Sequence, residues 1–172
     1  TDLKPTFMPN GKTVLIVMGV SGSGKSRIGK LLSEKLSRPF FDGDDFHPEA
    51  NVKKMSAGSP LNDEDRKGWL VALNKLAVEH KDKGAIIACS ALKKNYRSLL
   101  RAGMGNCMEF VYLDGSFELI KSRLEQRKGH FMPLNLLQSQ FDALEPPSKA
   151  ITVSIDETPA KVVKNIIKKL KD

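Results

Sequence analysis

Five short apolar runs alternate along the chain with longer segments of helical character. The runs are nearly continuous in apolar character, as strands are when a sheet buries them on both faces. In order, they are TVLIVM, RPFFD, AIIACS, MEFVYLD and AITVSI. The helical segments that follow them are residues 25–37, 64–81, 93–101, 117–127 and 160–171. This alternation predicts an α/β fold in which a five-stranded parallel sheet carries helices on both faces.

The length of 172 residues fits one domain, which we place at residues 1–172. The longest apolar run, residues 13–20, is much shorter than the roughly 20 residues of a membrane helix, and TDLKPTFMPN lacks the apolar core of a secretory signal. We therefore expect a cytoplasmic protein without a membrane partner. Cys89 and Cys107 are expected to be reduced core residues rather than a disulfide.

The formal charge of +8 favours anionic partners, among them phosphates, carboxylates and nucleic acid. Much of the excess lies in lysines at helical spacing, as in KNIIKKLKD, and such lysines more often form a solvated face. Aromatic residues make up 6% of the chain and are not interleaved with the basic ones, so a base-stacking surface is not expected. The composition therefore predicts a small anionic ligand and no nucleic acid.

A glycine-rich loop follows the first apolar run. Gly19, Gly24, Lys25 and Ser26 match the pattern G-x-x-x-x-G-K-[ST], between a predicted strand and a predicted helix. In such a loop, backbone amides and the helix N-terminus face phosphate oxygens, the lysine reaches the β and γ phosphates, and the serine hydroxyl is a ligand of Mg²⁺. A simple turn between strand and helix is the alternative. The residues predicted to contact a nucleotide are Gly19, Ser21, Gly22, Ser23, Gly24, Lys25, Ser26 and Arg27.

A cluster of carboxylates follows the second apolar run. Asp42, Asp44 and Asp45 lie at the end of this strand, at the sheet edge that carries the glycine-rich loop. Like charges this close repel one another, so a cation or a hydroxyl-bearing ligand would relieve them, and a kinase needs a carboxylate beside the attacking hydroxyl. The alternative is a polar loop in which aspartates cap turns. His47 is either a substrate contact or a turn residue before Pro48.

Five blocks of the sequence together resemble one known family. They are MGVSGSGKS, DGDDFHP, MSAGSPLNDEDRKGWL, CSALKKNYR and RKGHFMPLNLLQSQFDALEPP, in this order between residues 18 and 147. They are similar to the small gluconokinases, relatives of shikimate and adenylate kinases. The resemblance implies a three-layer P-loop kinase fold with a mobile lid. It also implies that the protein uses ATP and Mg²⁺ to phosphorylate the 6-hydroxyl of D-gluconate and gives 6-phosphogluconate.

The resemblance assigns roles to residues around the acceptor. Asp44 corresponds to the carboxylate at the accepting hydroxyl, and Asp42 to the residue behind the metal site of Ser26. Asp45 and His47 fall among the sugar-acid contacts, within an acceptor-binding segment at residues 46–66. Arg66 resembles the arginine that reaches across the acceptor pocket in related kinases. There it could hold the gluconate carboxylate, for which a planar guanidinium offers two parallel hydrogen bonds. Without the resemblance, Arg66 is a helix-surface residue paired with its acidic neighbours.

The block CSALKKNYR follows the third strand. Ser90 is therefore expected at the ligand edge of the sheet, and Lys93 and Arg97 on one helical face, where two cations suit an anionic acceptor or its phosphorylated product. The alternative is a helix that Ser90 caps and that exposes a basic side to solvent.

A second pair of cations precedes the block KGHF. Arg123 and Arg127 are spaced i, i+4, and the resemblance makes residues 124–147 a lid over ATP. Closure would bring Arg127 to the transferring phosphoryl group, and Arg123 is expected near the adenine. His130 either contacts phosphate or helps the lid to fold, and Arg27 reaches the α-phosphate or points to solvent. The segment LLQSQFDALEPP is predicted to pack rather than to take part in chemistry.

Other functions remain open from the sequence alone. The acceptor could be shikimate, a nucleoside monophosphate or another sugar acid, and a nucleotide-dependent switch without catalysis would carry the same phosphate loop. The family resemblance also suggests a homodimer.

Overall fold

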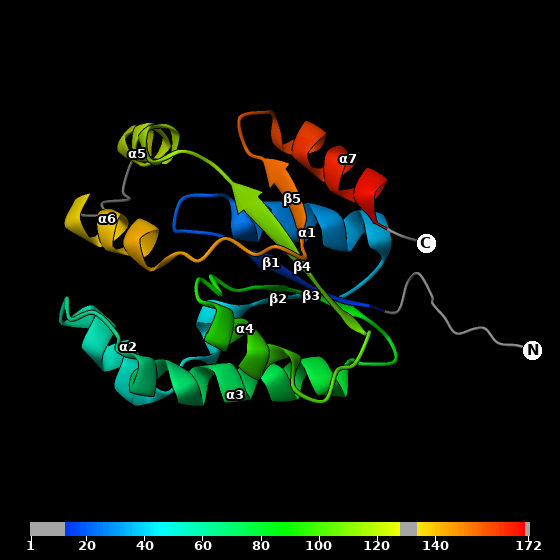
Figure 1. The fold of residues 1–172 in the computed structure, drawn as a ribbon, viewed down its shortest axis with the longest axis horizontal. Helices are drawn as coiled ribbons and strands as arrows, with labels where there is room; N and C mark the ends of the chain where they lie inside the picture. Colours follow the sequence, from blue (N-terminus) through cyan, green and yellow to red (C-terminus); the bar gives the residue numbers. More distant parts are fainter. Residues whose placement is uncertain (1–12, 128–133, 171–172) are drawn as a thin grey trace, which may run out of the picture.

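The computed structural model describes residues 13–127 and 134–170 and contains a five-stranded sheet with all strands parallel. The strand order is β2-β3-β1-β4-β5 (Figure 1). The strands are β1 (Val14–Met18), β2 (Phe40–Asp42), β3 (Ala85–Ala88), β4 (Met108–Asp114) and β5 (Ile151–Ser154). All five predicted strands are confirmed.

The central strand explains why the apolar runs are continuous. Val14 of β1 pairs with Ala85 of β3 on one side and with Met108 of β4 on the other, so β1 has no free edge. Every residue of β1 is buried, because helices cover both faces of the sheet. At the edge, β5 instead alternates between buried and exposed residues.

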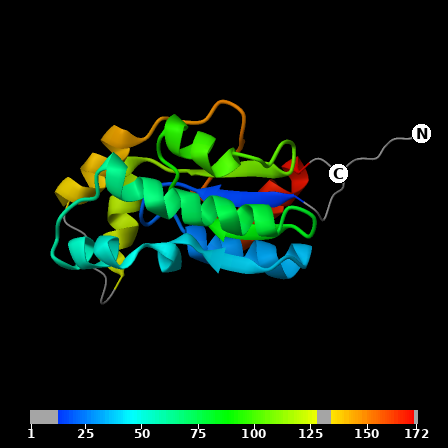
Figure 2. The same cartoon turned by 90° about the horizontal axis from the view of Figure 1, so that it is seen from below.

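Helices lie on both faces of the sheet and make three layers. Helices α3 (Asp63–Glu79) and α4 (Lys94–Arg101) cover one face, whereas α1 (Lys25–Leu36) and α7 (Pro159–Lys169) cover the other (Figure 1). The view from below shows α3 lying across the sheet (Figure 2). Two clusters of buried apolar side chains, one on each face, form the core. The predicted α/β architecture is thereby confirmed.

Four further elements shape the ligand edge. Helix α5 (Phe117–Gln126) was predicted, whereas α2 (Glu49–Ser56) and the 3₁₀ helix η3 (Gly43–Phe46) form where no helix was predicted. Helix α6 (Leu134–Ala143) forms from the segment predicted to pack. Among the described residues, no helix is both long and apolar enough to cross a membrane.

Backbone hydrogen bonds draw together the loops at the carboxyl ends of the strands. Asp42 at the end of β2 pairs with Ala88 at the end of β3. The amide of Gly19, just after β1, donates to the carbonyl of Ser90, just after β3, at 3.3 Å. The predicted glycine-rich loop, carboxylate cluster and third-strand block therefore meet at one edge.

Both cysteines are free, as predicted. Cys89 is buried beside β3, and burial raises the pKa of its thiol to about 12. The thiol is therefore protonated at neutral pH and serves as a small apolar core group.

Candidate active site

The loop between β1 and α1 requires glycine for two different reasons. Gly22 and Gly24 have φ angles of 85° and 96°, in the left-handed region that other residues resist. At Gly19, a Cβ atom would come within 2.7 Å of Ser23 Oγ and 3.1 Å of the Leu113 carbonyl oxygen. The loop therefore folds tightly against the sheet and leads directly into the N-terminus of α1, where anions are favoured.

Lys25, the first residue of α1, folds back over this loop. Its Nζ donates to the carbonyl oxygens of Gly19 and Val20, at 3.0 and 3.1 Å. Desolvation lowers the pKa of Lys25, while the carboxylates of Asp44 and Asp42 act in the opposite direction. The amine is thus held inside the loop, close to where phosphate oxygens would bind.

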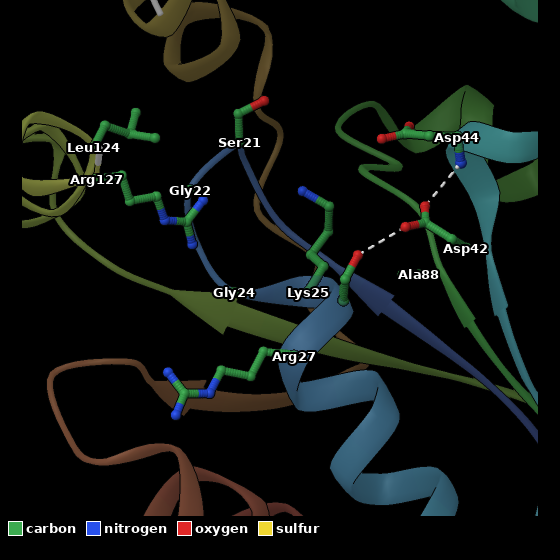
Figure 3. Close-up of a pocket in the computed structure, with 11 residues that line it drawn as sticks. Ser21, Gly22, Gly24, Lys25, Arg27, Asp42, Asp44, Ala88, Leu124 and Arg127 are labelled. Atoms are coloured by element: carbon green, nitrogen blue, oxygen red, sulfur yellow. Dashed lines mark hydrogen bonds between the residues drawn. The ribbon is translucent and has the colours of Figure 1, made fainter. Parts of the chain in front are cut away.

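A cavity of about 360 Å³ lies in front of the loop (Figure 3). In it, Ser26 Oγ donates to Asp42 Oδ2 at 2.9 Å, and the backbone amide of Asp44 donates to Asp42 Oδ1 at 3.0 Å. Asp42 is thereby the N-cap of η3 as well as the partner of Ser26. The cavity is lined by Ser21, Gly22, Gly24, Lys25, Ser26, Arg27, Asp42, Asp44, Ala88, Leu124 and Arg127.

The oxygens of Ser26 and Asp42 suit a hard cation such as Mg²⁺. Mg²⁺ is usually held by one or two protein oxygens, with water and phosphate oxygens completing its shell. Within residues 13–127 and 134–170, no group of three or more His, Cys, Asp or Glu side chains forms a complete metal site. The donor set therefore fits a cation that arrives with a nucleotide better than a resident structural metal.

A second cavity, of about 380 Å³, continues from the first. It shares Gly22, Gly24, Arg27 and Arg127 with the first cavity and adds Arg123 and Ser23. Arg123 Nη2 donates to the carbonyl oxygen of Ile155, after β5, so that α5 and the β5–α7 loop form its walls. Arg123, which was expected near the adenine, therefore lines this second cavity.

A third cavity, of about 460 Å³, opens on the other side of the loop. It shares Ser21, Lys25 and Asp44 with the first cavity and contains three other predicted substrate contacts, His47, Arg66 and Ser90. Helix α2 and the turn after it, α3 and α6 complete its walls through Met55, Gly58, Ser59, Pro60, Leu61, Trp69, Leu136, Ser139 and Gln140. Lys25 and Asp44 therefore stand at the boundary between the first and third cavities.

The ring of His47 is oriented by two neighbours. It stacks on Trp69 with ring centroids 4.2 Å apart, and its Nδ1 lies 3.2 Å from Asn51 Nδ2. The same Asn51 nitrogen donates to the carbonyl oxygen of Asp65 at 2.8 Å, which identifies it as the NH₂ group. Nδ1 of His47 is therefore an acceptor, and the proton of the neutral ring lies on Nε2. Burial lowers the pKa of His47, which keeps the ring neutral at pH 7.

Arg66 is held at the rim of the third cavity by one of its nitrogens. Nη1 donates to the carbonyl oxygen of Leu61 at 2.8 Å and to the hydroxyl of Tyr96 at 3.3 Å. The Tyr96 hydroxyl in turn donates to Asp63 Oδ1 at 2.5 Å. Among the described residues, Arg66 makes no further hydrogen bond, so Nη2 and Nε remain for a ligand.

Three predicted substrate contacts lie away from this cavity. Asp45 is exposed and lines none of the three cavities. Lys93 pairs with Asp63 at 3.5 Å. Arg97 is buried, donates from Nη1 to the Ala91 carbonyl and from Nη2 to the Glu145 carbonyl, and lines a different groove.

The expectation that Lys93 and Arg97 share one helical face is corrected by the position of the helix. Helix α4 begins at Lys94, so Lys93 is its N-cap residue and not part of the helical face. Ser90, the alternative cap, precedes the helix by four residues and faces the third cavity instead. His130 lies outside the described residues.

Sequence reasoning missed three residues that shape the site. Trp69 and Asn51 orient His47, and Gln140 of α6 forms hydrogen bonds with the glycine-rich loop, called the phosphate loop below. Trp69 is the single tryptophan of the chain, and its place in an apolar helical pattern predicts burial only. The other two act through long-range contacts that no local pattern contains.

Comparison with known proteins agrees with this geometry. Residues 21–171 match the family model described as shikimate kinase. The chain is 45% identical over 164 residues to the thermoresistant gluconokinase of Escherichia coli, covering 92% of this chain and 93% of the relative. It is 43% identical over 171 residues to the gluconokinase of Gluconobacter oxydans, covering 96% and 92%.

Solved structures show the same relationship. The crystal structure of a gluconokinase from Sinorhizobium meliloti 1021 matches with a TM-score of 0.86 at 38% identity, over 93% of this chain and 92% of that one. Shikimate kinase from Aquifex aeolicus shares the fold, with a TM-score of 0.66 at 24% identity, over 91% and 95%. The chain therefore belongs to the shikimate kinase family and, within it, to the gluconokinases.

Proposed function

We propose that this protein is an ATP-dependent gluconokinase that transfers the γ-phosphoryl group to the 6-hydroxyl of D-gluconate. One observation carries the proposal. Lys25 and Asp44 line both the first cavity, in front of the glycine-rich loop and called the phosphate cavity below, and the third cavity, called the acceptor cavity below. A transfer reaction needs this arrangement, because donor and acceptor must meet in line with little covalent chemistry by the protein. The relatives, which are named gluconokinases, indicate the acceptor.

The residues at this boundary supply the transfer chemistry. Asp44 orients the attacking hydroxyl and accepts its proton. Lys25 exchanges the loop carbonyls for phosphate oxygens, and Arg127, at the rim of the phosphate cavity, neutralises charge on the transferring group. When bound at Ser26 and Asp42, Mg²⁺ would offset the negative charge of the phosphates.

The third cavity fits a polyhydroxylated acid. Arg66 has Nη2 and Nε left for a carboxylate, and an arginine grips a carboxylate best through two parallel bonds. His47 presents an Nε2–H donor, and the Ser90 hydroxyl can donate or accept, which suits sugar hydroxyls. Residues 46–66 thus act as the acceptor-binding segment. Residues 124–147, of which 128–133 lie outside the described residues, act as the lid that excludes water during transfer.

The test is coupled ADP release with Mg-ATP. D-gluconate is compared with shikimate, nucleoside monophosphates, glucose and no acceptor. We expect turnover with gluconate, and loss of it in Lys25→Ala and Asp44→Asn. Asp82→Asn is the matched control, because Asp82 is exposed in the turn before β3, at the opposite end of that strand from the site. Turnover with another acceptor would overturn the substrate assignment, and ATP binding without turnover on any acceptor would favour a nucleotide switch.

The position of Trp69 allows acceptor binding to be measured directly. As the single tryptophan, it lines the third cavity, so gluconate should change its emission without nucleotide. Arg66→Ala should weaken this response, whereas Lys67→Ala, at the exposed neighbouring position, should retain it. Equal affinity in wild type and Arg66→Ala would refute the role of Arg66 in holding the carboxylate.

A further inference from the structure

Helix α6 is bonded to the phosphate loop through a single side chain. The backbone amide of Ser21 donates to Gln140 Oε1 at 2.7 Å, and Gln140 Nε2 donates to Ser21 Oγ at 3.0 Å. Both ends of the glutamine amide are therefore used on one residue that lies 119 positions away in the chain. Figure 3 shows the Ser21 hydroxyl pointing toward the neighbouring helix, away from the phosphate cavity.

Ser21 lies between the two cavities, as Lys25 and Asp44 do. It lines both the phosphate cavity and the acceptor cavity. Its amide donates to Gln140 Oε1. The loop around it contains Gly22 and Gly24, and glycine backbones have little intrinsic preference for one conformation. Contacts from outside the loop therefore determine its position.

Helix α6 can fix the loop because the segment just after its C-terminal end is itself held at Glu145. The Glu145 carboxylate accepts from the amide of Lys94 at 2.6 Å, and Arg97 Nη2 donates to the Glu145 carbonyl at 2.8 Å. The loop after β3 is in turn joined to the phosphate loop, where Ser90 accepts from the amide of Gly19. Hydrogen bonds thus link α6, the β3–α4 loop and the phosphate loop into a ring around the acceptor cavity.

We propose that Gln140 is a positioning residue for phosphoryl transfer, because it holds the phosphate loop through Ser21 in register with the acceptor cavity. Gln140 acts through Ser21 and not on the reacting atoms. The inference rests on the proposed function only in that one cavity takes a nucleotide and the other takes the acceptor. It gives a positioning role to the segment that the sequence predicted only to pack.

The decisive variant is Gln140→Met, which keeps the length and approximate volume of the side chain but removes both hydrogen bonds. MgADP affinity is measured by titration calorimetry without acceptor, so the result does not depend on which acceptor is used. We expect binding about tenfold weaker than in wild type, as loss of a pair of partly buried hydrogen bonds predicts. Gln138→Met is the matched control, because Gln138 is exposed on the same helix and bonds only Asp142 among the described residues.

A double-mutant comparison separates positioning from helix packing. In the phosphotransfer assay, Ser21→Ala should lower kcat/KM for ATP in wild type but add nothing in the Gln140→Met background, since the bond it removes is already absent. Unchanged MgADP affinity in Gln140→Met, additive effects of the two substitutions, or an equal loss in Gln138→Met would each overturn the proposal.

Discussion

The indole of Trp69 connects the core to the carboxylate cluster, and its replacement by phenylalanine tests that connection. Trp69 of α3 is 3% exposed, and its Nε1–H donates to the carbonyl oxygen of Gly43 at 2.7 Å. Gly43 lies between Asp42 and Asp44, so this bond holds the turn that carries both carboxylates. Phenylalanine keeps an aromatic ring in the core but has no donor.

The expected loss of stability follows from two parts. Leaving the Gly43 carbonyl without its buried partner costs about 2 kcal/mol. The smaller ring gives up apolar contact worth about 1 kcal/mol. The free energy of unfolding should therefore fall by about 3 kcal/mol in Trp69→Phe, which for a protein of this length lowers Tm by about 6–12 °C. Because Asp44 would lose its support, kcat should fall at least about tenfold.

The assay combines urea denaturation, followed by circular dichroism, with coupled ADP release at saturating substrates. Val71→Ala is the matched control, since Val71 lies on the same helix but is 40% exposed. Its free energy of unfolding should stay within about 0.5 kcal/mol of wild type. If Trp69→Phe also stays within that range and keeps normal kcat, the bond to Gly43 does not support the carboxylate turn.

Three further substitutions test other parts of the structure. Asn62→Ala removes the capping box that Asn62 and Asp65 form at the start of α3, and urea denaturation should show a loss of about 1 kcal/mol; no loss would mean that the cap is dispensable. Gly43→Ala would place a Cβ 2.4 Å from the Ala88 carbonyl oxygen, so kcat should fall with the displaced carboxylates, and normal kcat would contradict this. His47 has a pKa below its unfolded value of about 6.5, so the unfolded state binds the proton first and stability falls as pH drops through and below 6.5. His47→Gln should make the unfolding free energy less dependent on pH there, and an unchanged pH profile would refute the assignment.

The parts of the fold that sequence predicted well are those determined by burial and local chemistry. Strand β1 reads as a continuous apolar run because two neighbouring strands and two layers of helices surround it. The loop after it is recognisable because its glycines satisfy local steric demands, at Gly19 by close approach and at Gly22 by a left-handed backbone.

The parts that sequence missed depend on contacts between distant segments. Helix α2 has no apolar stripe, since the one buried residue among its members is Asn51, which bonds His47 and the Asp65 carbonyl. The partner of Gln140 is 119 residues away, and the helix containing it shows only an ordinary amphipathic pattern. Such positions are specified by tertiary structure, so propensity and spacing do not reveal them.

The arginines show how hydrogen-bond partners separate structural from functional cations at one sheet edge. Arg97 is buried and uses both Nη atoms on backbone carbonyls, so binding an anion would cost it those bonds. Among the described residues, Arg66 forms hydrogen bonds only through Nη1, so its Nη2 and Nε stay available. Arg27 and Arg127 line the nucleotide cavities, and within the described chain their guanidinium groups make no hydrogen bond or ion pair. Desolvating an unpaired guanidinium is costly, and both of these arginines are exposed to solvent. Arginine side chains thus stabilise the structure where their donors are used, and keep donors for a ligand only where they are not.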